Sequence, residues 1–357
     1  MNDSQMTHGR AVFYDEQRKA IRLEASKPLV YLDSCVWIDI AERFQPLSQR
    51  CRSLVQTGKV LFPVSFSAIQ EVVEQPTATK RSRVAALLDE LSRGVCFRPS
   101  GTIQKLEANL ALPVILGVAE TRLKREEILT WIVEFAAKMN LQFPPSWNQS
   151  EANRFTRLLA ARPEIRSVKW FVDHSPLGQM RSENAQRMER FVQGMEDAIA
   201  KSTSDYQHLA KDVRWKRLLF DERASVVENR ISPVITKSLL NIVGPEKLLA
   251  MIGAISKQVG EGGDQRLIQI MKAMPSLDIQ CHLMAERVSN HSRKPRKQDF
   301  FDVEHAVVGG AYADIFATSD GNLFDLLTRR CRVSTDRGCH VVRGATGLEE
   351  ALGQIAN

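Results

Sequence analysis

The sequence has neither a long apolar run nor the paired cysteines that several classes of protein require. No stretch approaches the roughly 20 apolar residues of a membrane-spanning helix, and no secretory signal pattern stands at the N-terminus. The six cysteines are scattered without a C-x-x-C pair, so neither a zinc knuckle nor a disulfide framework is indicated. We therefore expect a cytoplasmic protein with reduced thiols and no membrane partner. The G-x-x-x-x-G-K-[ST], H-E-x-x-H and G-x-S-x-G motifs are also absent, which removes the common NTPase, zinc-protease and serine-hydrolase signatures.

Carboxylates at the ends of apolar segments are the feature that remains. LVYLD predicts a short buried strand with Asp33 directly after it. Open parallel α/β sheets bind ligands at the carboxyl ends of their strands, so Asp33 occupies the position of a metal ligand. Alternatively, Asp33 only caps the helix that VWIDIAERF predicts. Position alone leaves both interpretations open.

A second apolar run, over residues 60–66, precedes Ser67, which we expect to be a helix N-cap, and Glu71 follows in the first helical turns. A capping role for Glu71 is the alternative, but its spacing from Ser67 is one residue longer than a capping box requires. Glu74 is the neighbouring acid that could take its place. We favour Glu71 because it lies closer to the strand end.

The C-terminal segment carries the densest group of acids. Asp302 opens a predicted helix, and DIFATSD predicts a strand that leads through Thr318 to Asp320. The separation, 320 − 302 = 18 residues, fits one helix and one strand returning to the same sheet edge. Convergence of like charges is costly without a cation, and carboxylate oxygens suit Mg²⁺ or Mn²⁺. Asp299 precedes this pair, and Asp314 lies between its two members.

The order of these motifs resembles PIN-domain ribonucleases. The chain presents a strand followed by Asp, then Ser-x-x-x-Glu, then Asp-x-x-His, then a strand ending in Thr-x-Asp, similar to larger bacterial PIN-like proteins; the likeness covers roughly residues 28–98 and 298–345. The resemblance implies a metal-dependent endoribonuclease of toxin or defence type with Mg²⁺ or Mn²⁺. A structure-specific DNase and a catalytically silent nucleic-acid-binding module are the alternatives. The implied residues are Asp33, Glu71, Asp302 and Asp320 as catalytic ligands, Asp299 and Asp314 as further metal ligands, and His305 and Thr318 as auxiliaries.

We accordingly expect a PIN-like three-layer α/β/α domain with a mainly parallel sheet. Residues 1–98 and 299–357 would form it, interrupted by a mostly helical insertion over 99–298. Residues 100–298 hold 30 Lys and Arg against 22 Asp and Glu (+8), whereas the rest of the chain holds 19 against 20 (−1). A basic surface beside a carboxylate site would help to capture a polyanion. A solvated helical surface would show the same excess.

Two basic clusters could hold a phosphate backbone near the metal. One directly precedes Asp299 and the other follows the Glu71 helix. Their members are Arg293, Lys294, Arg296 and Lys297 in the first, and Lys80, Arg81 and Arg83 in the second. Each cluster could equally be a solvated loop. RNA is favoured over DNA as the partner, and the sequence leaves a homodimer and a regulatory protein partner open.

Overall fold

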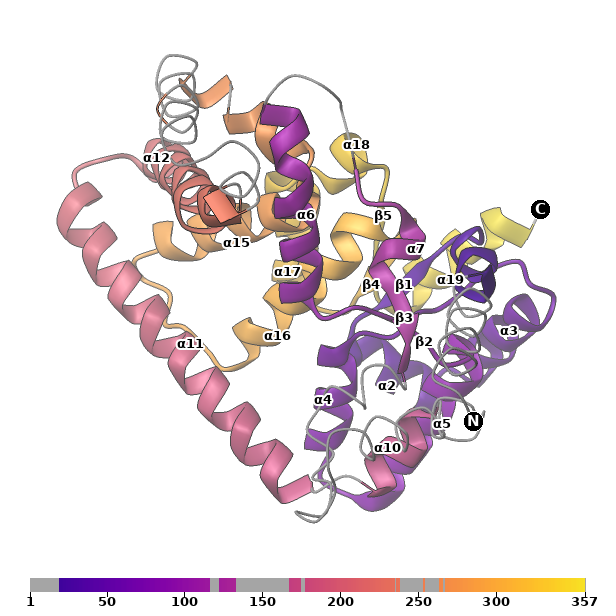
Figure 1. Cartoon of the computed structure of the whole chain (residues 1–357). Helices are drawn as coiled ribbons and strands as arrows, with labels where there is room; N and C mark the ends of the chain where they lie inside the picture. The colour runs from indigo at the N-terminus through magenta and orange to yellow at the C-terminus, as the bar shows by residue number, and fades with distance from the viewer. Residues whose placement is uncertain are drawn as a thin grey trace, which may run out of the picture.

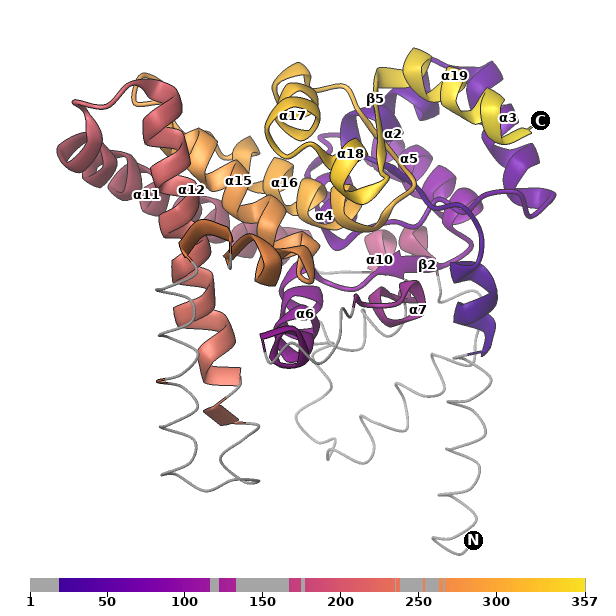
Figure 2. The same cartoon turned by 90° about the horizontal axis from the view of Figure 1, so that it is seen from above.

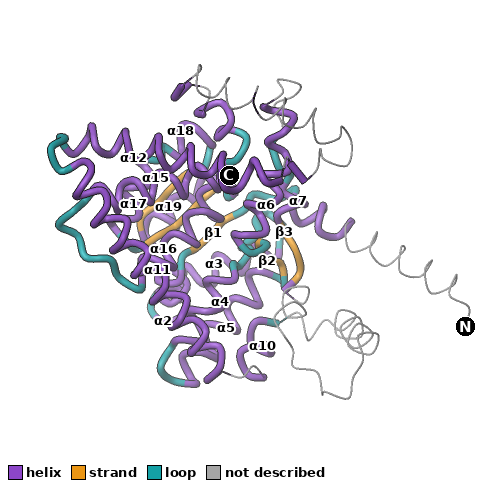
Figure 3. The backbone as a smooth tube through the Cα atoms, turned by 60° about the vertical axis from the view of Figure 1, so that its left-hand side comes forward, coloured by secondary structure: helices purple, strands orange, loops and turns teal. Residues whose placement is uncertain are grey.

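The computed structural model describes residues 19–115, 122–132, 167–174, 177–234, 236–237, 253, 263–265 and 267–356. Strands lie at the centre of the molecule and helices surround them (Figure 3). The strands are β1 (Val30–Leu32), β2 (Val95–Phe97), β3 (Leu129–Trp131), β4 (Ile315–Thr318) and β5 (His340–Arg343). The α-helices are α2 (Ser34–Glu42), α3 (Gln45–Gln56), α4 (Phe66–Glu74), α5 (Ala78–Ser92), α6 (Ser100–Ile115), α7 (Arg125–Ile128), α10 (Val168–His174), α11 (Leu177–Tyr206), α12 (Lys211–Val226), α15 (Pro275–Ser289), α16 (Gln298–His305), α17 (Gly321–Asp325), α18 (Val333–Arg337) and α19 (Gly344–Ala356). Three π-helical segments are η2 (Val227–Ile231), η3 (Ala306–Gly310) and η4 (Leu326–Arg330).

The central sheet is parallel and has the strand order β1-β4-β5. Tyr31 of β1 lies in register with Phe316 of β4, which is in register with Val341 of β5. A parallel bridge between Leu29 and Leu61 continues the pairing toward the N-terminal half of the chain. Because β1 and β4 run in the same direction, the residues that follow them emerge at one edge of the sheet. The predicted α/β class with a parallel sheet is confirmed.

Helices cover both faces of this sheet, since alternate strand residues enter different cores. Val30 and Leu32 pack in a core with Trp37 and other side chains of α2, α3, α4, α5 and α19. Tyr31 and Phe316 enter a second core with α15, η3 and η4. Strands buried on both faces read as continuous apolar runs, which is why VYL and IFAT are recognisable in the sequence.

The predicted insertion (99–298) does not form a body separate from these cores. β3 pairs antiparallel with β2, so the predicted boundary at residue 98 divides a two-stranded sheet. Val168 of α10 belongs to the first core, and Ile279 of α15 belongs to the second. A third core joins α12, η2 and α15, and α11 and α12 lie on the side of the molecule away from α3 and α19 (Figures 1 and 2). None of the described helices combines the length and apolar character needed to cross a bilayer.

Candidate functional site

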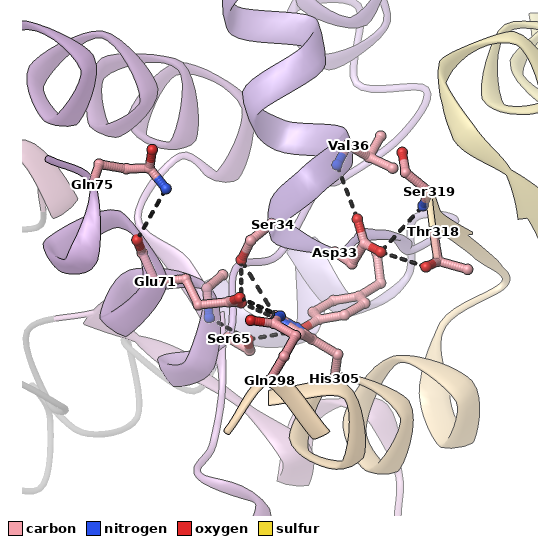
Figure 4. A network of polar contacts seen from close by, with 12 residues as sticks. Asp33, Ser34, Val36, Ser65, Glu71, Gln75, Gln298, His305, Thr318 and Ser319 are labelled. Atoms are coloured by element: carbon pink, nitrogen blue, oxygen red, sulfur yellow. Dashed lines mark hydrogen bonds and ion pairs between the residues drawn. The ribbon is translucent and has the colours of Figure 1, made fainter. Parts of the chain in front are cut away.

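The carboxyl ends of β1 and β4 meet through the side chain of Asp33. Its Oδ2 accepts hydrogen bonds from Thr318 Oγ1 and from the backbone N–H of Ser319, at 3.2 Å (Figure 4). Its Oδ1 accepts from Val36 N at 2.9 Å and so caps α2. The capping role and the place at the sheet edge are therefore both correct for Asp33. Asp320 stands two residues beyond β4 and similarly caps α17, accepting from Leu323 N at 2.8 Å.

Glu71 reaches the same edge from α4 and is held there by three side chains. Its Oε2 accepts from Ser34 Oγ at 2.5 Å and lies 2.5 Å from His305 Nε2. Its Oε1 accepts from Gln298 Nε2 at 3.0 Å. Glu74, the alternative acid, contacts Asn184 of α11 instead. The structure therefore brings Glu71, and not Glu74, to the strand ends.

The N-cap of α4 is Ser65 and not Ser67, because the helix begins at Phe66. Ser65 Oγ accepts from Ala68 N at 3.1 Å. The apolar run over residues 60–66 makes isolated parallel bridges at Leu61 and Val64 and gives way to the helix at Phe66. Glu71 consequently lies in the second turn of the helix, where its side chain can extend toward α16.

A buried polar chain connects Glu71 to the middle of the sheet. His305 Nδ1 lies 2.5 Å from Tyr31 Oη, and that hydroxyl donates to Ser65 Oγ at 2.6 Å. Burial is the largest single effect on the pKa of His305 and lowers it, but the carboxylates of Glu71, Asp33 and Asp302 together outweigh burial and the pKa is raised. Burial is likewise the largest effect on the pKa of Glu71 and raises it, but His305, with the hydrogen bonds from Ser34 and Gln298, outweighs burial and the pKa is lowered. The two side chains form a buried ion pair.

Asp302 and Asp299, both on α16, share the guanidinium of Arg287 from α15. Arg287 Nη2 lies 3.1 Å from Asp302 Oδ2 and 3.6 Å from Asp299 Oδ1, and Nη1 donates to Asp299 O at 2.7 Å. Burial raises the pKa of Asp302 to about 7; Arg287 opposes the shift, and the carboxylates of Asp320 and Asp299 add to it. Burial likewise raises the pKa of Asp33, although the hydrogen bond from Thr318 opposes it. Ionising this group of acids together is therefore costly.

Asp314 is not part of the cluster. It precedes β4, at the opposite end of that strand from Asp320, and four strand residues correspond to roughly 13 Å. Its Oδ2 accepts from Leu29 N at 2.8 Å, and its Oδ1 pairs with Arg125 Nη2 at 2.5 Å. The structure does not bring Asp314 together with the other predicted ligands, because the strand that follows it separates it from the acids beyond the strand's end.

The basic residues before α16 do lie beside the acids. Arg293 pairs with Asp299, and the backbone N–H of Arg296 donates to Asp299 at 3.0 Å. Lys294 is exposed, and Lys297 pairs with Glu189 of α11 at 3.1 Å.

The second basic cluster lies on α5. Lys80 pairs with Glu42 at 3.6 Å, and Arg81 donates to Gln75 O at 2.8 Å, while Arg83 is exposed. These contacts connect α5 to α2 and to the end of α4, and none of them reaches a carboxylate of the cluster.

The donor set is what a hard cation requires, but the carboxylates point to partners within the chain. In the described part of the chain, no group of three or more His, Cys, Asp or Glu side chains has the arrangement of a metal site. Asp33, Asp302 and Asp320 supply oxygens of the kind that Mg²⁺ and Mn²⁺ bind, but both oxygens of Asp33, like both oxygens of Glu71, already accept hydrogen bonds within the protein. The residues fit a divalent cation in their chemistry, with Arg287 as the competing positive charge.

Two important residues of the site carried no signal in the sequence. Arg287 lies in the middle of an ordinary helix, and Tyr31 is one apolar-run residue among several. No protein-family model, curated protein or solved structure matches the chain.

Proposed function

We propose that the chain is a divalent-metal-dependent endonuclease with a PIN-like fold, acting on RNA in preference to DNA. One observation supports it most: carboxylates from four separate segments gather at the carboxyl edge of one parallel sheet. Asp33 contacts the end of β4, Glu71 contacts α16, and the carboxylate of Asp320 adds to the raised pKa of Asp302. Hydrolysis of phosphodiesters by metal ions uses acids in such an arrangement.

A bound Mg²⁺ or Mn²⁺ would supply Lewis acidity and lower the pKa of a water molecule. Asp33, Asp302 and Asp320 are the side chains that would hold it. The cation would also relieve the cost of ionising Asp302, whose pKa lies at about 7 without it. Arg287, which partners Asp302 in the absence of a metal, would then share that carboxylate with the ion.

The chain's own residues keep Glu71 in one place. An imidazolium at His305 donates from Nε2 to Glu71 and from Nδ1 to Tyr31, whose hydroxyl in turn donates to Ser65. The donors of His305 and Tyr31 in this network each have an acceptor, so Glu71 remains ionised and fixed. Its position beside Gln298, which is exposed, places this carboxylate near the opening of the site.

Labelled single-stranded RNA and duplex DNA, incubated with Mg²⁺, with Mn²⁺ and with chelator, test the proposal. We expect internal cleavage of RNA with either metal and none with chelator. Asp320→Asn should abolish cleavage, while Asp39→Asn, a partly buried position of α2 paired with Arg43, should not. Cleavage of DNA alone would favour the DNase, and RNA binding without cleavage under any metal would favour the silent binding module.

A further inference from the structure

A polar pocket of about 490 Å³ lies beside the acidic cluster. Its walls come from α12, α15, the loop after α15, α17 and η4, so it joins the helical part of the chain to the end of the sheet domain. Five cationic side chains line it, which are Lys211, Arg287, Arg293, Arg329 and Arg330. Glu286 and Asp325 are the carboxylates of the lining, and Leu326 is its one apolar side chain. Such a lining favours an anion over an apolar ligand.

The pocket and the carboxylate cluster share residues. Arg287 lines the pocket and, with its guanidinium, contacts both Asp299 and Asp302. Arg293 also lines the pocket and pairs with Asp299. Asn322, a further lining residue, follows Asp320 by two positions. An anion in the pocket would therefore lie next to the acids that we propose as metal ligands.

The cations of the pocket are held in place without being fully neutralised by its lining. Glu286 is shared between Lys211 at 3.3 Å and Arg330 at 3.1 Å. Arg330 also lies over the ring of Trp215, 4.9 Å from its centre, which orients the guanidinium. Arg329 pairs with Asp325 at 3.4 Å, but both side chains are more than half exposed, and such surface pairs contribute little. Arg330 also pairs with Asp212, outside the lining, at 3.0 Å, so the more exposed Lys211 and Arg329 are the cations best able to turn toward a stronger anion.

The guanidinium of Arg287 is a separate example of a cation in the pocket whose hydrogen bonds are incomplete. Its side chain is only 3% exposed, and its Nε–H is buried with no hydrogen-bond partner among the described residues. Unpaired buried donors are uncommon and frequently mark functional positions. Guanidinium groups recognise phosphate through paired N–H donors, and two asparagine amides, Asn290 and Asn322, add further donors to the walls.

We propose that this pocket binds a phosphate group of the nucleic acid strand whose cleavage the neighbouring carboxylates carry out. The inference rests on the proposed nuclease function for the identity of the strand, but the phosphate site itself depends on the pocket alone. The phosphate comes either from a strand terminus or from the backbone beside the scissile position.

Binding measured in chelator separates the pocket from catalysis, because no metal is present and no cleavage occurs. Fluorescence anisotropy with a 3′-labelled single-stranded RNA, carrying either a 5′-phosphate or a 5′-hydroxyl, would compare the wild type with Lys211→Gln/Arg329→Gln. Both side chains are at least half exposed, at 51% and 78%, so the double variant should fold. Arg217→Gln is the matched control: Arg217 is exposed, pairs with an aspartate four residues away as Arg329 does, and lies outside the pocket.

We expect the double variant to bind at least about tenfold more weakly at low salt. Its salt dependence should be shallower, by about 0.7 log units for each phosphate that the protein no longer neutralises. The control should bind as the wild type does. Tighter wild-type binding of the 5′-phosphorylated RNA would identify a terminal phosphate as the source, and equal binding of the two RNAs would identify the backbone. If the double variant and the control bind alike, the pocket is not a phosphate site.

The two proposals fail separately. Wild-type protein that never cleaves with Mn²⁺, but loses binding in the double variant, would overturn the nuclease and leave the phosphate site. Metal-dependent cleavage with unchanged binding in the double variant would overturn only the phosphate site.

Discussion

His305 Nε2 lies 2.5 Å from Glu71 Oε2, and both side chains are almost completely buried. The pair joins two segments that are 234 residues apart in the sequence. Because each partner shifts the pKa of the other toward its charged form, the pair contributes to stability only where both are ionised.

The pH dependence of this pair is the first prediction. The pKa of His305 is raised above its usual 6.5, so its contribution is complete below about pH 6.5 and is lost as pH rises through the raised value. The pKa of Glu71 is lowered below 4.5, so its contribution is lost as pH falls through that lowered value. A double-mutant cycle of Glu71→Gln and His305→Gln, measured by urea unfolding in chelator, should give a coupling of about 1–3 kcal/mol at pH 6. The coupling should shrink by pH 9; an equal coupling at both pH values would contradict a charged pair.

The close approach of Gly309 to Tyr31 leads to the second prediction. A Cβ at Gly309 would overlap Tyr31 Cδ1 and lie 2.9 Å from its Cε1. Gly309→Ala should therefore cost about 1–3 kcal/mol of unfolding free energy and displace the Tyr31 hydroxyl from His305. Gly194→Ala is the control, since nothing lies within 4 Å of its Cβ on α11, and it should be neutral or stabilise by up to about 1 kcal/mol. Similar midpoints of urea unfolding for Gly309→Ala and Gly194→Ala would contradict the close packing of Gly309 against Tyr31.

The convergence of the site on the sheet edge could be predicted because it depends on local signals. The runs that become β1 and β4 are apolar and short, and Asp33 and Asp320 follow them closely. The same strand assignment places Asp314 before Ile315, at the other end of β4, which already separates it from Asp320 in the sequence. The helix cap lies at Ser65 and not at Ser67. The sequence could not distinguish them, because the two serines stand two residues apart and either could begin the helix.

The remaining parts of the site depend on contacts between distant segments. Tyr31 meets His305 across 274 residues, and nothing in either local sequence indicates the other. Arg287 is one basic residue among many in the helical region, and only the packing of α15 beside α16 places it at Asp302. The pairing of β2 with β3 across the predicted boundary at residue 98 likewise has no local signal, because the three-residue strand β3 carries too short a pattern to predict it.

The third prediction concerns Arg287, the positive charge within the acids. In chelator at pH 7.5, Arg287→Gln should lose about 3–5 kcal/mol of unfolding free energy, because Asp302 remains buried without its guanidinium partner and Asp299 keeps only Arg293. The loss should be smaller at pH 5.5, below the Asp302 pKa of about 7, where that carboxyl is protonated and needs no cation. Mn²⁺ should restore more stability to the variant than to the wild type. A loss of unfolding free energy that is the same at both pH values and is unchanged by Mn²⁺ would contradict this role of Arg287.

The basic loop before α16 supports a fourth prediction. Lys294 and Arg296 have exposed side chains, so Lys294→Gln/Arg296→Gln should leave stability unchanged and weaken RNA binding. The salt dependence should become shallower by about 0.7 log units for each phosphate that these side chains neutralise in the wild type. Lys80→Gln/Arg83→Gln, on α5, provides the comparison. Weaker RNA binding in the α5 variant than in the loop variant would identify α5 as the strand-binding surface.

Calorimetric titration of the wild type with Mn²⁺ tests the central claim most directly, because the carboxylates at the sheet edge are proposed to hold a divalent cation. We predict saturable binding at pH 7.5 that weakens at least about tenfold, or about 1.4 kcal/mol, in Asp33→Asn and in Asp302→Asn. Asp314→Asn, at the opposite end of β4, should bind Mn²⁺ as the wild type does, with circular dichroism confirming that each variant is folded. Wild-type protein that binds no Mn²⁺, or equal affinity in the wild type, Asp33→Asn and Asp302→Asn, would contradict the account.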